Sequence, residues 1–409
     1  MPGQSRGFEI VRDPLWDNIR LEPAAVCAMD TAAFQRLRYV RQLGHAFLVY
    51  PGATHSRFEH ALGAYHLARR ALATLAERDL DGIPESEQLA VRLAALLHDI
   101  GHYPFSHALE EAGFPGHEAL GAARLREGAL GDVLRSLGGD ALIDRIAALI
   151  QGQSDSPLAG LVSGSLDLDK IDYLSRDARM CGVPYGVVDV DRLLASLTLV
   201  EDGVGACEVG LNEKGTSALE SLLFAKYQMY RNVYWHHAVR SATCMFKRAV
   251  RTAVTAGNLD PAAVATATDG ALSTLLLERD STGLARALQE RRLYKRALDL
   301  PATDVPELPA WIASDPARLA EREDALAAEL GLAPGEVLID FPARESMLSV
   351  DLALRTRDGA IERLTDAGRA GQLGLPRVAD ELYRSARRLR VFTSEGRVLE
   401  RVPELILTA

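Results

Sequence analysis

Histidine and aspartate side chains gather in short segments that lie far apart in this 409-residue chain, and they restrict how it can fold. The segments hold His60, the pair His98 and Asp99, and Asp169. A lone His-Asp pair is common and usually only ends a helix, but the combination favours a shared site. Neutral imidazoles and carboxylates suit borderline-hard divalent metals, and two of each can leave positions open for water and a phosphate oxygen. The fold must therefore bring these segments to one metal.

Local patterns predict a helix for each segment. Ser56 followed by Glu59 forms a capping box, which starts a helix at about residue 57 and sets His60 in its first turn. A second helical pattern opens at Pro84 and stops near Gly101, so His98 and Asp99 fall on its last turn.

The third helix is predicted over about residues 165 to 181, ended by Gly182. Asp169, Tyr173 and Asp177 follow at intervals of four, so one stripe carries a candidate ligand, an aromatic ring and a second carboxylate. Asp167 lies about 200° around the same helix and is expected to cap its start.

Longer stretches around these residues resemble the HD-domain deoxynucleoside triphosphate (dNTP) triphosphohydrolases. The resemblance rests on FQRLRY and QLG in 34–44, VYPGA in 49–53, RFEHALG in 57–63, LHDIGH and PFSH in 97–107, and DLDKIDY with RD in 167–177. It spans roughly residues 8 to 250 and is nearest to the bacterial single-chain branch and to the catalytic domain of the sterile-alpha-motif branch. No such extra domain is expected before residue 8.

The resemblance implies a metal-dependent reaction at the α-phosphorus of a dNTP, which yields a deoxynucleoside and triphosphate. It assigns a divalent cation (Mg, Mn, Fe, Co, Ni or Zn, one ion or two) to His60, His98, Asp99 and Asp169. His107 is the candidate donor of a proton to the leaving 5′-oxygen, because Glu110 three residues later can orient its ring. Phosphate and pocket contacts are implied at Arg57, His102, His117 and Lys170.

A further helix, over about residues 217 to 254, is predicted from the capping box of Ser217 and Glu220. The resemblance implies that this helix and its surroundings bind the substrate through Gln42, Leu43, Tyr173, Asp177, Lys226 and Tyr234. An aromatic ring beneath C2′ would leave no room for a ribose 2′-hydroxyl. Tyr230 on the same stripe is expected to pack in the core.

Asp30, Gln35 and Arg38 have the spacing of a guanine-reading activator site in the sterile-alpha-motif branch. The resemblance therefore implies activation by GTP or dGTP and a homo-oligomer, a dimer or tetramer. The alternative is an exposed helix face that Asp30 caps.

The chain is expected to be mostly α-helical, with an HD-domain catalytic region over residues 1–330 and a small α+β domain over 331–409. A hairpin is predicted at 198–210, a loop at 301–309, strands at 337–339 and 348–352, a turn at Asp358 and Gly359, and a helix at 378–389.

Composition favours a cytoplasmic protein. Cys27, Cys181, Cys207 and Cys244 lack a metal-type spacing and are expected to be free thiols, and charged residues interrupt every apolar stretch that could span a membrane. No apolar run near residue 1 resembles a signal peptide. The net charge of −10 argues weakly against a surface that coats nucleic acid.

The resulting hypothesis is a dNTP triphosphohydrolase. One alternative is an HD phosphohydrolase that acts on another nucleotide or a nucleic-acid end, and the sugar-contacting positions Gln42, Tyr173 and Tyr234 argue against it. A nucleotide-sensing scaffold with secondary hydrolysis is a second alternative, and the intact set of four metal ligands argues against that one.

Overall fold

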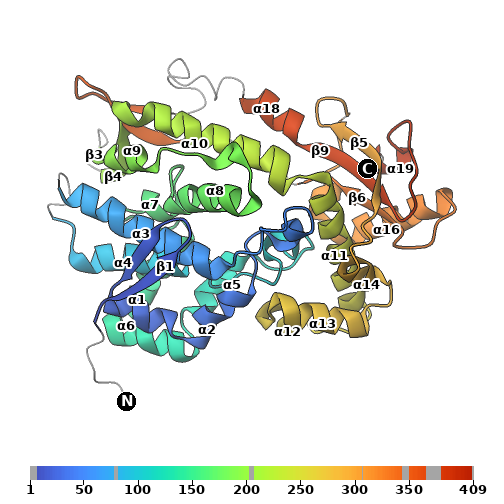
Figure 1. Cartoon of the computed structure of the whole chain (residues 1–409), viewed down its shortest axis with the longest axis horizontal. Helices are drawn as coiled ribbons and strands as arrows, with labels where there is room; N and C mark the ends of the chain where they lie inside the picture. Colours follow the sequence, from blue (N-terminus) through green and yellow to red (C-terminus); the bar gives the residue numbers. More distant parts are fainter. Residues whose placement is uncertain are drawn as a thin grey trace.

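The structure is a computed structural model that describes residues 7–77, 82–201, 207–305, 307–342, 350–364 and 379–407. It is mostly helical, as predicted (Figure 1). The helices of the first half are α1 (Pro23–Met29), α2 (Ala32–Gln35), η1 (Arg36–Tyr39), η2 (Gly44–Leu48), α3 (Arg57–Ala76), α4 (Glu85–Leu97), η3 (Ser106–Ala108), α5 (His117–Arg124), α6 (Gly128–Ile150), α7 (Gly160–Ser163), α8 (Leu168–Cys181), η4 (Pro184–Gly186) and α9 (Val190–Ala195).

The second half continues with helices and short strands. Its helices are η5 (Glu213–Gly215), α10 (Thr216–Met229), η6 (Tyr230–Tyr234), α11 (His237–Thr255), α12 (Pro261–Thr266), α13 (Asp269–Arg279), α14 (Leu284–Gln289), α15 (Trp311–Ser314), α16 (Pro316–Glu329), α18 (Ala379–Ala386) and α19 (Glu404–Leu407). The strands of the chain are β1 (Glu9–Asp13), β2 (Asp17–Leu21), β3 (Leu197–Glu201), β4 (Cys207–Asn212), β5 (Lys295–Pro301), β6 (Val337–Asp340), β7 (Leu352–Arg355), β8 (Ile361–Leu364) and β9 (Arg388–Thr393).

Helix α3 begins as its capping box predicts. The Glu59 carboxylate accepts the Ser56 backbone N–H at 2.5 Å, which satisfies a donor left open at the helix start. One side of α3 packs against α4 and another against α8 (Figure 1). The three helices that carry the predicted metal motifs therefore lie side by side.

Helix α8 begins at Leu168, three residues later than predicted. The reason is Asp167, whose side chain accepts the Lys170 N–H at 3.0 Å and caps the helix in an extended conformation. This confirms the capping role expected for Asp167. The helix ends at Gly182, which has φ +69°, a left-handed conformation that glycine adopts without strain.

The single helix predicted over residues 217 to 254 is wrong. Helix α10 ends at Met229, a π-turn covers Tyr230–Tyr234, and α11 starts at His237. The Trp235 N–H donates to the Tyr230 carbonyl at 2.9 Å, so one extra residue enters this turn. The expected capping box is also absent, because α10 begins at Thr216 with Gly215 as its N-cap.

The short strands build three sheets. Strands β1 and β2 form a hairpin, β3-β4-β7-β8 form a mixed sheet in which β4 and β7 are parallel, and β5-β9-β6 form an antiparallel sheet. The predicted hairpin is present in β3 and β4, while its turn at 202–206 lies outside the described residues, as does Leu348. Two sheets pair strands from both sides of the boundary predicted at residue 331, so main-chain hydrogen bonds join the two segments.

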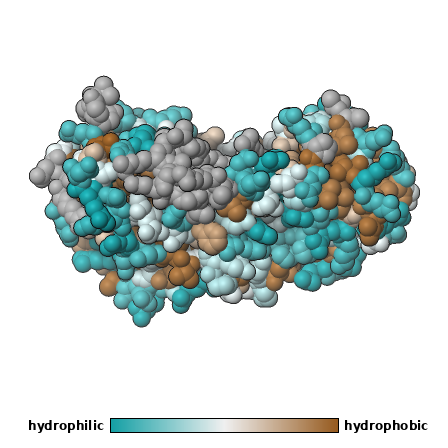
Figure 2. Space-filling model, turned by 90° about the horizontal axis from the view of Figure 1, so that it is seen from above, coloured by the Kyte–Doolittle hydropathy of each residue, from teal (hydrophilic) through white to brown (hydrophobic). Residues whose placement is uncertain are grey.

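The interior is built chiefly from aliphatic side chains of α3, α4, α6, α8 and α10. A space-filling view shows a largely hydrophilic face, with hydrophobic side chains gathered toward one end of the long axis (Figure 2). All four cysteines are free thiols, as predicted. Within the described ranges, no helix has the length and apolar character needed to span a membrane.

Candidate metal and substrate site

The four predicted metal ligands come together where α3, α4 and α8 meet. His60 Nε2 lies 2.8 Å from Asp169 Oδ1 and 3.1 Å from His98 Nε2. His98 Nε2 lies 3.4 Å from Asp99 Oδ1 and 3.5 Å from Asp169 Oδ1. The ligand atoms of His60, His98 and Asp99 thus form one close group, Asp169 lies against its two histidines, and this donor set suits a divalent cation.

Helix ends aim these side chains at one another. His60 lies in the first turn of α3, His98 ends α4, Asp99 follows it, and Asp169 lies in the first turn of α8. The His98 Nδ1 atom lies 2.9 Å from the Ala95 carbonyl oxygen, which fixes the ring with Nε2 toward the cluster. Because the ligands lie at helix ends, three helices can place their side chains around one point.

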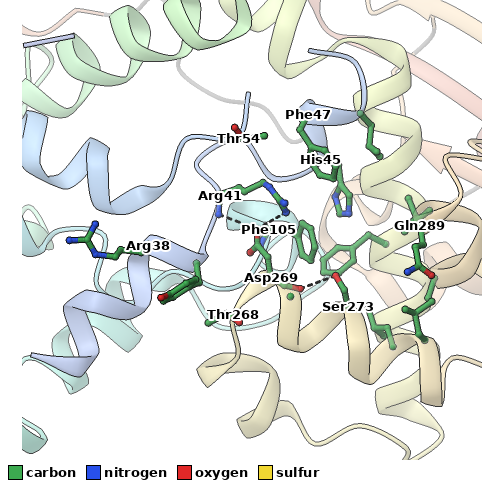
Figure 3. Close-up of a pocket in the computed structure, with 18 residues that line it drawn as sticks. Arg38, Arg41, His45, Phe47, Thr54, Phe105, Thr268, Asp269, Ser273 and Gln289 are labelled. Atoms are coloured by element: carbon green, nitrogen blue, oxygen red, sulfur yellow. Dashed lines mark hydrogen bonds and ion pairs between the residues drawn. The ribbon is translucent and has the colours of Figure 1, made fainter. Parts of the chain in front are cut away.

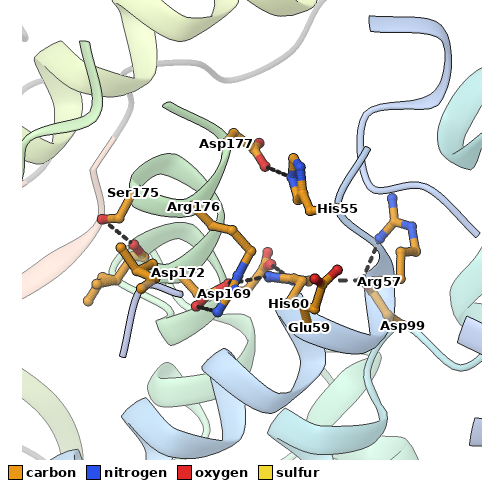
Figure 4. A network of polar contacts seen from close by, with 12 residues as sticks. His55, Arg57, Glu59, His60, Asp99, Asp169, Asp172, Ser175, Arg176 and Asp177 are labelled. Carbon is orange, nitrogen blue, oxygen red and sulfur yellow. Dashed lines mark hydrogen bonds and ion pairs between the residues drawn. The ribbon is translucent and has the colours of Figure 1, made fainter. Parts of the chain in front are cut away.

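Buried, ion-paired side chains hold the His60 ring at its Nδ1 atom, opposite the Nε2 atom that faces the other metal ligands (Figure 4). Asp172 Oδ2 lies 2.8 Å from His60 Nδ1, and Arg176 Nε donates to the same oxygen at 2.9 Å. Arg176 also donates to Asp13 at 2.8 Å, and Trp16 Nε1 donates to Asp172 Oδ1 at 2.5 Å. Carboxylates behind a ligand histidine orient its ring and raise its basicity.

No role was predicted from the sequence for Asp13, Trp16, Asp172 or Arg176. Asp172 and Arg176 carry a usable signal, because they lie four residues apart on α8 and can pair on one face. Asp13 and Trp16 come from the N-terminal hairpin, and nothing in their own segment shows that they reach α8.

The carboxylates around the site set the charge of its histidines. Burial tends to lower the pKa of His60, but hydrogen bonds to Asp169 and Asp172 outweigh burial and raise it to about 10. Burial likewise opposes ionisation of Asp99, yet the adjacent Arg57 guanidinium holds the pKa of that carboxyl well below its usual value. The site is rich in negative charge, and a cation can replace the proton on His60.

A second cluster lies next to the first. It consists of His102, His107, Glu110 and His117, whose ligand-type atoms gather around the Glu110 carboxylate. Glu110 Oε1 lies 3.0 Å from His117 Nδ1 and 3.3 Å from His107 Nδ1, which places Glu110 beside His107 as predicted. His102 Nε2 lies 3.1 Å from Asp99 Oδ1 and joins the two clusters.

These histidines differ in exposure and charge. The His102 side chain is buried, and burial together with Arg57 and His117 lowers its pKa well below the usual value, so it is neutral. The His107 side chain is 60% exposed and is therefore open to solvent. Burial resists ionisation of Glu110, but His107 and His117 lower its pKa to about 2, so the carboxylate is charged beside both rings.

A cavity of about 510 Å³ opens beside both clusters. Of the predicted substrate and catalytic residues, its lining includes Gln42, Leu43, Arg57, His107, Glu110, Asp169, Tyr173, Asp177 and Tyr234. Tyr230, Trp235, Arg240 and Thr243 also line it and were not predicted to do so. Tyr230, expected in the core, is partly buried and packs against the core, and its ring also meets that of Tyr234 edge-on with 5.0 Å between centres.

Polar groups in this cavity are arranged around Asp177. Its carboxylate accepts the Tyr234 hydroxyl at 2.7 Å and lies 2.8 Å from His55 Nε2. The buried Gln42 Oε1 has no hydrogen-bond partner among the described residues, so it can accept from a bound hydroxyl. The Tyr173 ring lies between the metal-ligand cluster and the polar groups around Asp177. Its centre is 6.5 Å from that of the His60 ring and 6.4 Å from that of the Tyr234 ring.

The two predicted lysines do not line the cavity. Lys170 Nζ pairs with the Asp167 carboxylate and donates to the Gly164 carbonyl at 2.9 Å. Lys226 Nζ lies 6.0 Å from the centre of the Tyr230 ring. A phosphate contact from Lys170 would require its side chain to leave Asp167.

Asp30, Gln35 and Arg38 lie on the surface formed by α1, α2 and η1. Arg38 Nε donates to Gln35 Oε1 at 2.7 Å, and Gln35 Nε2 donates to the Met29 carbonyl at 2.9 Å. The Arg38 guanidinium also lies 3.5 Å above the Phe58 ring. Asp30 is exposed at the end of α1, where it is the C-cap and not the N-cap of a helix.

Comparison with known families agrees with this geometry. The HD domain matches residues 57–177, the range that holds all four metal ligands, and the HD associated region matches residues 188–395. The chain belongs to the HD-domain dNTPase-like family. The HD associated region covers half of this HD-domain protein. It also crosses the domain boundary predicted at residue 331.

Relatives of this HD-domain protein include proteins with and without a named activity. An uncharacterized protein of Methanocaldococcus jannaschii is 36% identical over 75% of this chain and 63% of its own length. Deoxynucleoside triphosphate triphosphohydrolase SAMHD1 of Bos taurus is 30% identical over 56% of this chain and 45% of its own length. The chain therefore matches less than two thirds of either relative.

Solved structures share the fold over nearly the whole chain. A hypothetical protein from Aquifex aeolicus has a TM-score of 0.74 and 26% identity, covering 95% of this chain and 96% of that one. A phosphohydrolase from Bacteroides thetaiotaomicron has a TM-score of 0.73 and 23% identity, covering 95% of this chain and 100% of that one. The arrangement of helices and sheets described here is thus found in both.

Proposed function

We propose that this HD-domain protein hydrolyses dNTPs to deoxynucleosides and triphosphate. The observation that carries the proposal is the four-ligand cluster beside a cavity in which Tyr173, Tyr234 and Asp177 face one another. The related enzymes named as deoxynucleoside triphosphate triphosphohydrolases support the same substrate class.

A divalent cation would be held by His60, His98, Asp99 and Asp169, and when bound it would neutralise phosphate charge and acidify a water molecule. Arg57 pairs with Asp99 and donates through Nε to Ser106 Oγ at 3.0 Å. These contacts hold the guanidinium at the cavity wall, where its remaining N–H groups can bind a phosphate oxygen.

His107 would protonate the leaving 5′-oxygen. It lines the cavity, its side chain is 60% exposed, and Glu110 Oε1 lies 3.3 Å from its Nδ1 atom, where the carboxylate can orient the ring. His102 is neutral and buried against Asp99, so it suits hydrogen bonding to phosphate better than proton donation.

The deoxyribose would lie against Tyr173 and Tyr234. Asp177 and Gln42 offer acceptors on the same cavity wall for the 3′-hydroxyl. A ring packed against C2′ excludes a hydroxyl there by contact, so ribonucleotides should bind less well.

Incubation of the purified protein with each dNTP and NTP, in Mg, Mn, Fe, Co and Ni, tests the proposal when the products are separated. Deoxynucleoside and tripolyphosphate are expected from dNTPs, with Asp169→Ala as the inactive control. Release of orthophosphate or pyrophosphate, or equal rates with ribonucleotides, would favour another HD phosphohydrolase. Binding of nucleotides without turnover in any metal would favour a sensing scaffold.

We also infer an activator site for GTP or dGTP at Asp30, Gln35 and Arg38, and with it a homo-oligomer. The support is that Asp30 and Arg38 are exposed, and Arg38 donates to the half-buried Gln35 between them in the sequence. An effector must bind one assembly better than another to activate, so GTP should raise hydrolysis of another dNTP and shift the sedimentation profile. Asp30→Ala should abolish both responses and spare metal binding; nucleotide-independent rates and assembly in the unchanged protein would exclude the site.

A further inference from the structure

A second cavity adjoins the substrate cavity, and Figure 3 shows the residues that line it. It has a volume of about 550 Å³ and lies between η2 on one side and α11, α13 and α14 on the other. His45 and Phe105 line both cavities, so they form the partition. The volume is that of a small-molecule site, and the proposed reaction makes no use of it.

Most of the wall is aromatic or aliphatic. It includes Phe47, Leu48, Phe105, Phe246, Leu276 and Leu288. His45 stacks on Phe105 with ring centres 4.3 Å apart and planes 4° from parallel, and Phe246 lies 5.0 Å from His45. Flat rings stacked in this way present broad faces and edges to the cavity, which favours a planar aromatic occupant.

His45 supplies a buried polar group without a partner. The residue is 5% exposed, and its Nδ1 atom has no hydrogen-bond partner within the described part of the chain. Burial, with help from Arg41, lowers the pKa of His45 to about 3, so the ring is neutral and has one N–H donor and one acceptor. Buried polar atoms are normally satisfied, and Figure 3 shows this ring directed from η2 toward α13.

The Arg41 guanidinium faces this cavity and has N–H groups left to bind a ligand. Arg41 lies 4.3 Å above the Phe47 ring and 3.4 Å from Asp269 Oδ2, and its side chain is 34% exposed. Asp269 is otherwise engaged, since it accepts the backbone N–H groups of Phe105 at 2.9 Å and Arg41 at 3.1 Å. Arg38, at the rim, is already held by Gln35 and Phe58. The lining thus carries two guanidiniums and one carboxylate, a net charge of +1 that a single acidic group matches and a triphosphate does not.

We propose that this second cavity binds a planar aromatic molecule with one acidic group, its ring against Phe47, Phe105 and His45 and its acid on Arg41. The site shares Arg38 with the inferred activator site at its rim and differs from it in ligand and in all other residues. It also stands apart from the proposed function, because no step of the argument uses dNTP hydrolysis.

The partition connects this cavity to the metal ligands. Phe105 and Ser106 have φ values of 58° and 61°, a left-handed conformation that costs energy for residues with side chains and is kept only where the surroundings impose it. Asp269 in the second cavity fixes the Phe105 N–H, and Ser106 Oγ fixes Arg57, the partner of Asp99. A ligand that moves Phe105 would therefore also move Arg57.

The aryl sulfonate naphthalene-2-sulfonate is a suitable probe, because its fused ring is planar, fluorescent and carries one acidic group. Fluorescence titration and calorimetry should show one molecule bound per chain. Arg41→Gln should weaken binding about tenfold, the usual effect of losing one charge-assisted hydrogen bond. Arg135→Gln is the matched control, because Arg135 is 41% exposed and pairs with an aspartate at 3.1 Å on α6, and it should bind as the unchanged protein does.

Filling the cavity separates this site from other apolar surfaces. Ser273→Trp should abolish binding, and Gln289→Trp at the exposed rim serves if the first variant misfolds by circular dichroism. Equal affinity in the filled variants, displacement by a non-hydrolysable dNTP, or no binding up to about 1 mM would each overturn the site.

The connection to the metal has its own readout. Saturating probe should change the dissociation constant for Mn²⁺ at least twofold in the unchanged protein, whether or not dNTPs are hydrolysed. In Arg41→Gln, a probe concentration too low to occupy the variant's cavity should leave the Mn²⁺ dissociation constant unchanged. Probe binding with an unaltered Mn²⁺ affinity would overturn the connection.

Discussion

At the scale of single residues, charge and exposure distinguish the histidines of the site. His60 is buried between two carboxylates and is suited to a cation, while His102 is buried and neutral. His107 differs from both because its side chain is 60% exposed and contacts Glu110. A group that must take up a proton from solvent in every turnover needs this access, which supports the proposed role of His107 as the proton donor.

His107→Ala should therefore slow turnover about 100-fold or more while changing substrate affinity little. An activated leaving group, such as the nitrophenolate of a nitrophenyl phosphodiester, needs no proton and should lose far less. Steady-state kinetics on both substrates make the comparison, with His237→Ala, outside the cavity lining, as the control. Equal losses on the two substrates would instead assign a positioning role to His107.

At the scale of elements, the site depends on how closely α3 and α8 approach. Gly63 on α3 faces the Asp172 and Arg176 side chains of α8, and a Cβ atom there would lie 1.8 Å from Asp172 Oδ1 and 2.6 Å from Arg176 NH2. Both side chains are fully buried and paired, so they have no room to withdraw. Because Gly63 has no side chain, the Asp172 carboxylate has room to contact His60 Nδ1.

Gly63→Ala should displace Asp172 and weaken metal binding about 10- to 100-fold, although Gly63 is not a ligand. Overpacking should also lower the free energy of unfolding by about 1–3 kcal/mol. Gly270→Ala on α13 is the matched control, because no atom lies within 4 Å of the added methyl group. Metal content after dialysis in a metal buffer and thermal melts provide the readouts; wild-type metal affinity in Gly63→Ala would refute the role of this close approach.

The sequence predicts those elements and residues whose signals are local. A few neighbouring residues are enough to determine the α3 capping box, the Asp167 cap and the end of α8 at Gly182. The metal ligands likewise belong to short motifs. Contacts between distant segments have no such signal. The reach of Asp13 and Trp16 to α8, the pairing of β5 with β9 and the second cavity all arise from tertiary packing.

The π-turn at Tyr230–Tyr234 was missed for a different reason. Its residues continue the helical spacing of α10, and only the longer hydrogen bond to Trp235 reveals the added residue. The turn places Tyr230, Tyr234 and Trp235 along the cavity, so the error in the helix prediction falls at the substrate site.

At the scale of the whole molecule, buried charges join the C-terminal sheet to the helical body. Arg240 of α11 donates to Asp340 of β6 at 2.6 Å and to Glu111 at 2.8 Å. Nearby, Glu323 of α16 accepts the Ile339 N–H at 2.8 Å and an Arg248 N–H at 3.2 Å. Arg240 and Glu111 also line the substrate cavity, so the sheet helps to support its wall.

Burial raises the pKa of Glu323 to about 7, above its usual value of 4.5. Stability from the protonated carboxyl is fully present below about pH 4.5 and is lost as pH rises through 7, because the unfolded chain ionises more readily. Glu323→Gln cannot ionise, so its unfolding free energy relative to the unchanged protein should rise by about 2–3 kcal/mol between pH 5 and pH 8.

Urea unfolding at the two pH values measures this difference. The control is Glu329→Gln, an exposed position on the same helix, where the difference should not depend on pH. A pH-independent difference for Glu323→Gln would show that Glu323 is ionised in the folded protein across the range.

In the proposed reaction, water attacks the α-phosphorus of a dNTP at the four-ligand site. Hydrolysis in ¹⁸O-labelled water, followed by mass spectrometry of both products, tests it most directly. The account predicts one ¹⁸O atom per turnover in the tripolyphosphate, none in the deoxynucleoside, and no turnover by Asp169→Ala. Label in the deoxynucleoside, or in orthophosphate released beside a deoxynucleoside diphosphate, would contradict it.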